Sequence, residues 1–350
     1  MSMDVVTFGE AMVRLSPPDF QRLEQTSSLD TKIGGAELNV AVAVSRLGLK
    51  SRWVSRLTEN PLGRMVRNEA RKHGVDTDCI VWTPEDRVGI YFVEFGASPR
   101  PSSVLYDRAG SAISKIAPGM VDWDAVFAGA RLFHCSGITP ALSDSAAAAT
   151  REALVAAKKA GCTVSYDLNY RGKLWTAKKA EEIQTPMMEY VDILISTEED
   201  TKKVFGIHGG VTPPACGNAS VEDGTFKAVS SETYGIVAQK LAEKFSFDTV
   251  AITLREDITV WRNTWGAVAY HGGQVYEGPR FDVEIVDRVG GGDSFNAGFI
   301  YGYLTKDVEY GLQFGNAFSA LAHSVPGDFN YCTREEAEAL LKGGNLRIRR

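Results

Sequence analysis

The chain has 350 residues, of which 44% are apolar and 23% charged, and its formal net charge is −6. A chain of this size can bury a large core, and the lack of a basic block other than residues 347–350 argues against nucleic acid as a partner. Its five cysteines are widely spaced and form no C-x-x-C pair, so neither a zinc site nor a disulfide framework is indicated. No apolar stretch reaches membrane-spanning length and no leader precedes the first strand-like run, so we expect a cytoplasmic protein without a membrane partner.

Short apolar runs rich in β-branched residues alternate along the chain with longer segments of helical period. The expected strands are residues 5–8, 52–57, 132–135, 163–166, 191–195 and 249–253. The expected helices are residues 37–47, 143–159, 197–204, 234–245 and the apolar run 295–304. This alternation predicts a mostly parallel sheet with helices on both faces. Ligands of such sheets collect at the carboxyl ends of the strands.

Two stretches, at about 14–33 and 88–108, are strand-like without an intervening helix. They predict a small separate sheet that covers the active-site edge as a lid and excludes water; the alternative is an extra edge hairpin. Residues 208–232 are rich in Gly, Pro and small polar residues, which indicates an irregular surface insertion. We expect one domain over residues 1–350.

A run of three glycines, Gly290, Gly291 and Gly292, leads into Asp293 and an apolar helix. Backbone without a Cβ exposes its N–H groups, and the first N–H groups of a helix lack partners and lie at the positive end of its dipole. Together they predict a site for phosphate, beside which Asp293 can accept a proton from a hydroxyl nucleophile. The alternative is a glycine-rich turn with Asp293 as the helix N-cap.

A second glycine cluster, Gly34 and Gly35, opens the helix that contains Asn39. A Gly-Gly pair lets a ligand approach the backbone closely, and an Asn side chain offers both a donor and an acceptor to sugar hydroxyls. Such pairs also precede helices for packing reasons alone.

The two glycine clusters together resemble the paired signatures of the PfkB (ribokinase-like) carbohydrate kinases, over essentially the whole chain. The resemblance extends to residues 167–171, 196–199 and 326–328 and to Asn316, and segments 8–10, 106–112, 169–171 and 327–330 look most like the 2-keto-3-deoxygluconate kinases of that family. It implies a ribokinase-like three-layer α/β sandwich with a mostly parallel central sheet and a small β-sheet lid. The implied reaction is Mg²⁺-assisted transfer of the ATP γ-phosphoryl group to a sugar hydroxyl.

The resemblance also implies roles for individual residues. Asp293 would be the catalytic base, and the amides of Gly290, Gly291 and Gly292 would hold the charge of the transferring group. Glu199 would orient Mg²⁺ through water; the alternative is a solvated residue in an acidic first helical turn. On the nucleotide side, Asn169 and Arg171 would reach the phosphates and Thr253 and Arg255 the ribose, with Asn316 near the base.

Arginines decide the expected substrate, because a keto-deoxy acid differs from a neutral sugar by its carboxylate and Arg binds carboxylate in bidentate fashion. Arg108 and Arg171 match substrate contacts of the resembling kinases, although a lone Arg is usually solvated or in a surface ion pair worth ~0–1 kcal/mol. Tyr91 and Tyr106 would bind or pack beside the sugar, and Asp328 would contact a hydroxyl. Two tryptophans and two histidines are expected to have structural roles: Trp261, Trp265, His134 and His323.

The sequence departs from the family pattern at several positions. Ser196 replaces the Asn of an Asn-x-x-Glu motif, Arg288 stands where Thr or Ser is usual, and Thr58 stands where many members have Gly. Residues 253–258 lack the glycine-rich turn that many members place beside the ribose.

We therefore expect an ATP-dependent kinase that converts 2-keto-3-deoxygluconate into its 6-phosphate. Alternatives are a family kinase for fructose, ribose or the galactonate epimer, and a sugar-binding regulator without catalysis. A dehydrogenase is disfavoured because no G-x-G-x-x-G follows the first strand. By analogy with lid sheets of this family, a homodimer is expected.

Overall fold

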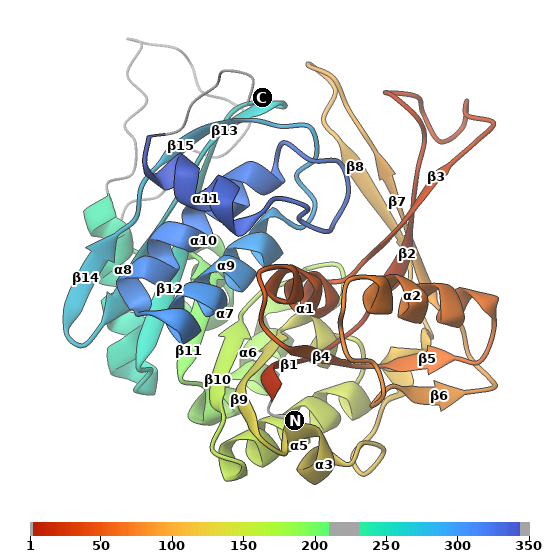
Figure 1. Ribbon diagram of the computed structural model, residues 1–350, viewed down its shortest axis with the longest axis horizontal. Coiled ribbons are helices and arrows are strands. Elements are labelled where there is room, and N and C mark those ends of the chain that lie inside the picture. Colours follow the sequence, from red (N-terminus) through yellow and green to blue (C-terminus); the bar gives the residue numbers. More distant parts are fainter. Residues whose placement is uncertain (1–2, 210–230, 344–350) are drawn as a thin grey trace.

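The computed structural model describes residues 3–209 and 231–343 (Figure 1). Its main sheet has nine strands in the order β14-β13-β12-β11-β10-β9-β1-β4, with β15 paired to β13. Neighbours from β4 to β12 are parallel, and those from β12 to β15 are antiparallel. The strands are β1 (Met3–Phe8), β4 (Ser51–Val54), β9 (Ala130–Ser136), β10 (Thr163–Asp167), β11 (Ile193–Thr197), β12 (Thr249–Thr259), β13 (Arg262–His271), β14 (Gln274–Glu277) and β15 (Phe281–Glu284).

Helices cover both faces of this sheet. One face packs against α1 (Ala36–Arg46), α9 (Gly291–Thr305), α10 (Val308–Ala322) and α11 (Arg334–Leu341). The other packs against α3 (Trp123–Phe127), α5 (Asp144–Lys159), α6 (Ala177–Gln184), α7 (Glu198–Phe205) and α8 (Ser231–Phe245). Three shorter elements lie between the longer helices and strands: α4 (Ile138–Ala141) and the 3₁₀ helices at Ala112–Lys115 and Thr185–Tyr190. Helix α2 (Pro61–Lys72) lies at the right of Figure 1, next to the separate small strands that are described below. The predicted three-layer α/β fold is confirmed.

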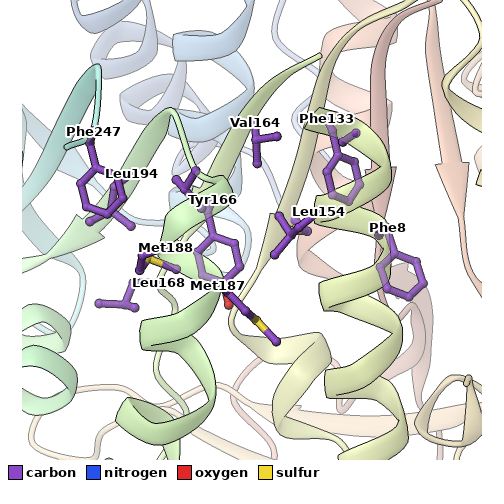
Figure 2. Packing of buried hydrophobic residues seen from close by; sticks show 14 of the residues in the cluster. Phe8, Phe133, Leu154, Val164, Tyr166, Leu168, Met187, Met188, Leu194 and Phe247 are labelled. Atoms are coloured by element: carbon purple, nitrogen blue, oxygen red, sulfur yellow. The ribbon is translucent and has the colours of Figure 1, made fainter. Parts of the chain in front are cut away.

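Apolar side chains along the central strands point alternately to the two faces of the sheet, so that each face has its own hydrophobic core. Val6, Phe133 and Val164 face the layer of α5, whereas their neighbours Val5 and Leu132 face the layer of α9. Figure 2 shows the first core, in which Phe133 and Tyr166 from the sheet meet Leu154 of α5. Each fully buried side chain of this kind contributes about 1.5–3 kcal/mol, so the sheet is a rigid base for the loops at its carboxyl end.

The expected elements are found with two differences. The predicted strand 52–57 is divided, because β4 is the last strand of the main sheet and the chain leaves it after Val54 to form β5 (Arg56–Thr58), which pairs with β6 (Val81–Thr83). The predicted strand 249–253 continues to Thr259 as β12, so residues 253–258 form a hairpin arm with β13. Most of the predicted insertion at 208–232 lies outside the described residues.

The two predicted lid segments form one four-stranded sheet in the order β3-β2-β7-β8, which stands beside the helices at the right of Figure 1. Its strands are β2 (Met12–Ser16), β3 (Asp30–Gly34), β7 (Gly89–Glu94) and β8 (Ser103–Asp107). β2 ends directly before Pro17 and Pro18, which cannot donate to a β ladder. The separate sheet is therefore present, while its function as a lid stays a prediction. Across the described residues, no helix is both long and apolar enough to cross a membrane.

Helix α9 is held against α10 by glycines on both helices. A Cβ at Gly298 would lie 2.8 Å from the Cα of Gly315, and a Cβ at Gly302 would collide with Gly311. Only glycine permits this close approach of two backbones. The N-terminus of α9 is thereby fixed at the carboxyl edge of the sheet.

Candidate active site

A cavity of about 570 Å³ opens at the carboxyl ends of β10, β11 and β12, opposite the N-terminus of α9. This is where the sequence places the phosphate loop, and the loop is part of its wall. The predicted residues that line the cavity are Asn169, Arg171, Glu199, Thr253, Arg255, Gly290, Gly291, Gly292 and Asp293.

The three glycines of the loop have three different environments. Gly290 is the N-cap of α9 with a φ of 82°, and a Cβ there would collide with the backbone of Asp328. A Cβ on Gly291 would lie 2.8 Å from the ring of His323, and the Gly291 N–H donates to the carbonyl of Arg288 at 3.3 Å. Gly292 has no such constraint, and a Cβ there would enter open space. The absence of a side chain at Gly292 therefore keeps the cavity open, and the Gly291 amide, which already donates to Arg288, is the least available of the three to an anion.

Asp293 lies in the first turn of α9, so the alternative in which it is the N-cap is wrong. Its Oδ2 accepts a hydrogen bond of 2.6 Å from Nδ2 of Asn39, whose Oδ1 accepts from the N–H of Gly35 at 3.2 Å. Burial raises the pKa of Asp293 to about 7, and the Asn39 hydrogen bond opposes that rise. The carboxylate is thus fixed in place and titrates where a general base works best. Asn39 therefore orients Asp293, and its contact with the sugar stays a prediction.

Two further buried acids, Asp167 and Glu37, lie close enough to Asp293 to affect its pKa. Asp167, at the end of β10, accepts hydrogen bonds from Nδ2 of Asn296 at 2.8 Å and from the backbone N–H of Asn169 at 3.1 Å, and burial raises its pKa. Glu37 accepts from the N–H and the hydroxyl of Ser136 at 3.1 and 2.6 Å, and burial raises its pKa to about 7. Both carboxylates raise the pKa of Asp293 by like-charge repulsion, and Arg171 lowers it.

The acidic start of α7 faces the same cavity. Glu199 is exposed and pairs with Lys203 at 2.5 Å, while burial raises the pKa of Asp200 to about 6. The described part of the chain contains no group of three or more His, Cys, Asp or Glu residues that could hold a metal ion by itself. Mg²⁺ in phosphotransferases keeps several waters and takes one or two carboxylates together with substrate phosphates, so Glu199 and Asp200 fit such an ion.

Asn316 was expected near the nucleotide base, and that role stays a prediction. It does not line the cavity, is fully buried in α10, and donates from Nδ2 to the carbonyl of Pro279 at 3.2 Å. It therefore supports the loop after β14 from behind. His323 and Trp265 line the cavity wall and pack on each other with ring centroids 5.2 Å apart, whereas His134 is buried in the sheet with its pKa lowered to about 3.

Some of the residues expected to bind sugar form a second group at the small sheet, namely Gly34, Tyr91, Tyr106 and Asp328. The hydroxyl of Tyr91 donates to Asp328, and a Cβ on Gly34 would collide with both side chains. Tyr91 stacks on Tyr106 with ring centroids 5.9 Å apart. This group meets the cavity where Gly290 touches the backbone of Asp328 and where Asn39 holds Asp293.

Arg108 already pairs with one carboxylate in this structure, while its buried Nε has no hydrogen-bond partner. Its guanidinium forms a buried ion pair with Glu10, which also accepts a hydrogen bond from the Ser111 hydroxyl at 2.5 Å. A substrate carboxylate would share this guanidinium with Glu10 or displace it. Arg171 is exposed and lines the cavity. The sequence predicted the same role for both arginines, whereas the structure places them in different environments.

Sequence reasoning missed several residues of the site. Asp167 could have been found, because it directly follows a buried strand and begins a segment that the resemblance covers. Glu37 and Asn296 lie inside helices whose periodicity gave no sign of a polar pocket. Arg14 carried no signal at all, since its partners are 273 and 314 residues away.

A family model described as pfkB family carbohydrate kinase matches residues 2–335. The chain belongs to the pfkB family of carbohydrate kinases. The 2-dehydro-3-deoxygalactonokinase of Haloferax volcanii is 40% identical over 351 residues, which cover 100% of both chains. The 2-dehydro-3-deoxygluconokinase of Bacillus subtilis is 29% identical over 346 residues, 97% of this chain and 96% of the relative.

Solved structures agree with this assignment. The crystal structure of 2-dehydro-3-deoxygluconokinase from Thermotoga maritima has a TM-score of 0.90 and 44% sequence identity, and the match covers 98% of this chain and 99% of that one. The resemblance found in the sequence is thus confirmed, and the chain is a carbohydrate kinase. Within this pfkB kinase, the base, the glycine loop and the cavity are the candidate catalytic parts.

Proposed function

We propose that this chain transfers the γ-phosphoryl group of ATP to the terminal hydroxyl of 2-keto-3-deoxygluconate, giving the 6-phosphate and ADP. The observation that carries the proposal is the Asp293 carboxylate, held by Asn39 at 2.6 Å beside the open glycine loop, with its pKa raised to about 7 by burial. Relatives named for the gluconate and galactonate forms of this keto-deoxy acid support the substrate class.

In the proposed step, Asp293 takes the proton of the attacking hydroxyl while the new oxygen–phosphorus bond forms. The bond between the γ-phosphorus and the bridging oxygen breaks, and ADP leaves with that oxygen. The amides of Gly290 and Gly292 stabilise the charge on the transferring group, because fixed donors need no reorganisation when charge develops. Mg²⁺ would neutralise charge on the phosphates, and Glu199 and Asp200 would hold it. Asn169 and Arg171, which line the same cavity, would reach the phosphates.

The galactonate epimer is the second candidate, because the relative from Haloferax volcanii is named for it and is 40% identical to this chain. A coupled assay for ADP release over both keto-deoxy acids, fructose and ribose decides the matter. We expect turnover on one or both acids, dependent on added Mg²⁺ and abolished by EDTA. Turnover on fructose or ribose alone would reject the sugar-acid assignment, and no turnover on any sugar would favour a binding regulator.

The setting of the reaction is also part of the proposal. Cys79, Cys135, Cys162 and Cys332 are all free thiols, which suits a reducing cytoplasm. A homodimer through the small sheet stays a prediction by analogy, to be checked by light scattering.

A further inference from the structure

Two arginines at the cavity share a single carboxylate oxygen. Arg255 lies on β12 and Arg288 in the loop before α9, and both line the cavity. Nε of Arg255 lies 3.5 Å from Oδ1 of Asp257, and Nη1 of Arg288 lies 3.8 Å from the same oxygen. Both distances are longer than a charge-assisted hydrogen bond of about 2.7–2.9 Å. Neither arginine is therefore fully paired with this acid.

The other acids of this region do not supply the missing charge. Asp287, next to Arg288 in the chain, is bound at 2.6 Å by Arg14. Glu256 lies on the opposite side of β12 from its neighbours in the chain and accepts from the hydroxyl of Thr264 at 3.3 Å. Within the described residues, the ion-pair geometry thus gives Arg255 and Arg288 one shared acid, and one positive charge is left without a partner.

The two guanidinium groups also repel each other. Burial lowers the pKa of Arg288, and the nearby charge of Arg255 lowers it further. Nη2 of Arg288 donates to the carbonyl of Val260 at 2.8 Å, which holds the side chain in place without neutralising it. An anion that bound both arginines would relieve this repulsion, and a phosphate group matches the planar fork of a guanidinium.

We propose that Arg255 and Arg288 together bind the β- and γ-phosphates of the nucleotide, an inference that rests on the proposed function. Arg288 is two residues before Gly290, so its anchored side chain lies beside the loop that would receive the transferring group. A neutral ribose, the partner expected for Arg255 from the sequence, gives no reason for two cations at one place.

Asp257 gives the inference its sharpest test, because it competes with phosphate for both arginines. We would measure binding of AMP, ADP and ATP by calorimetry in the absence of sugar, for the wild type and for Arg288→Gln, Arg255→Gln and Asp257→Asn. We expect Arg288→Gln to weaken ADP and ATP by roughly tenfold to a hundredfold, the range for a lost hydrogen bond to a charged group. AMP, which lacks both phosphates concerned, keeps its affinity. We expect Asp257→Asn to tighten ADP and ATP several-fold.

Arg262→Gln is the matched control. Arg262 lies on the neighbouring strand β13, is exposed, pairs with Asp282 at 3.0 Å and is not part of the cavity wall. Its loss removes the same charge, so equal weakening of ADP by Arg262→Gln would overturn the inference in favour of a general field effect. Weakening of AMP and ADP by the same factor in Arg288→Gln would also overturn it, since that points to a distorted β12–β13 turn.

The test still gives an answer if one variant does not fold or if the sugar substrate is a different one. If Arg288→Gln fails to fold, Arg288→Lys and Asp257→Asn decide the matter: an unchanged or weakened ADP affinity in Asp257→Asn would reject the shared site. Because all of these are binding equilibria without sugar, they are settled even if 2-keto-3-deoxygluconate proves not to be the substrate.

Discussion

The guanidinium of Arg14 joins the small sheet to the start of the glycine loop through Asp287. Nη2 of Arg14 donates to Oδ2 of Asp287 at 2.6 Å, and Nη1 donates to Oδ2 of Asp328 at 2.7 Å. Asp287 also accepts from the N–H groups of Val289 and Gly327 at 3.1 and 2.9 Å. Burial disfavours the charge on Arg14, but Asp328 and Asp287 together raise its pKa above the ordinary value. One buried cation therefore sets the position of both the loop and the expected sugar contact.

Replacing Arg14 should destabilise the protein strongly. In Arg14→Gln, the carboxylates of Asp287 and Asp328 stay buried without their counter-charge, and breaking a buried pair in this way costs about 3–5 kcal/mol. Urea unfolding measures the change. The control is Arg87→Gln, which removes an exposed pair with Asp107 and should cost no more than about 1 kcal/mol. A loss below about 1 kcal/mol in Arg14→Gln would show that the network carries little stability.

Two alanine substitutions in the loop should separate stability from catalysis. Gly292→Ala places a methyl group in open cavity space within a helix, so stability should stay equal or rise by about 0.5–1 kcal/mol while turnover collapses. Gly290→Ala forces a residue with a Cβ into a φ of 82° against the backbone of Asp328 and should lower stability by about 1–2 kcal/mol or more. Thermal unfolding and the coupled assay measure both properties. Near-normal turnover in Gly292→Ala would remove the loop from the phosphoryl-transfer step.

The pH profile should follow Asp293. Because burial raises its pKa to about 7 and the base must be deprotonated to act, kcat/KM should fall as the pH drops below about 7. The Asn39 hydrogen bond lowers this pKa, so Asn39→Ala should move the acid limb to higher pH. Asp293→Asn should keep ATP and sugar binding while turnover collapses. An unshifted acid limb in Asn39→Ala, or substantial turnover in Asp293→Asn, would assign the base elsewhere.

Glu37 should make the protein less stable as the pH rises. Its folded pKa of about 7 lies above the ordinary value of 4.5, so the folded state holds an extra proton between these pH values. Stability is then lost as the pH rises through that window, by up to about 3 kcal/mol. Glu37→Gln keeps an oxygen for Ser136 and carries no charge, so its stability relative to the wild type should increase from pH 5 to pH 8. A constant difference over that range in urea unfolding would contradict the raised pKa.

Selectivity for a sugar acid should depend on both arginines, by different routes. Arg171→Gln removes an exposed cavity cation that is expected to serve both the phosphates and the substrate carboxylate, so it should raise KM for ATP with every sugar and should raise KM about tenfold more for the keto-deoxy acid than for a neutral sugar. Arg108→Ala should also lower kcat/KM for the keto-deoxy acid more than for a neutral sugar, but it leaves the Glu10 carboxylate buried without a partner. The double variant Glu10→Gln with Arg108→Gln removes both charges together and is therefore the better test. Equal losses on acid and neutral substrates would refute the carboxylate argument.

The sequence was most informative where a signal is local. Periodicity predicted the sheet and its helices, and the glycine run predicted where the cavity lies, because both depend on residues close together in the chain. The partnerships of Asn39 with Asp293 and of Arg108 with Glu10 join residues 254 and 98 positions apart. No pattern along the chain encodes such pairs, so the sequence did not reveal that each of these two side chains also has a partner inside the protein.

The backbone contact between α9 and α10, at Gly298 with Gly315 and Gly302 with Gly311, leaves no compressible side chain between the two helices. Helix α9, which carries Asp293, cannot slide or tilt towards α10 without a collision between the two backbones. Any approach of donor and acceptor during turnover must therefore be made by the substrates and by whatever closes over them. The α9 side of the cavity is therefore a rigid wall, and the substrates have to be brought to it.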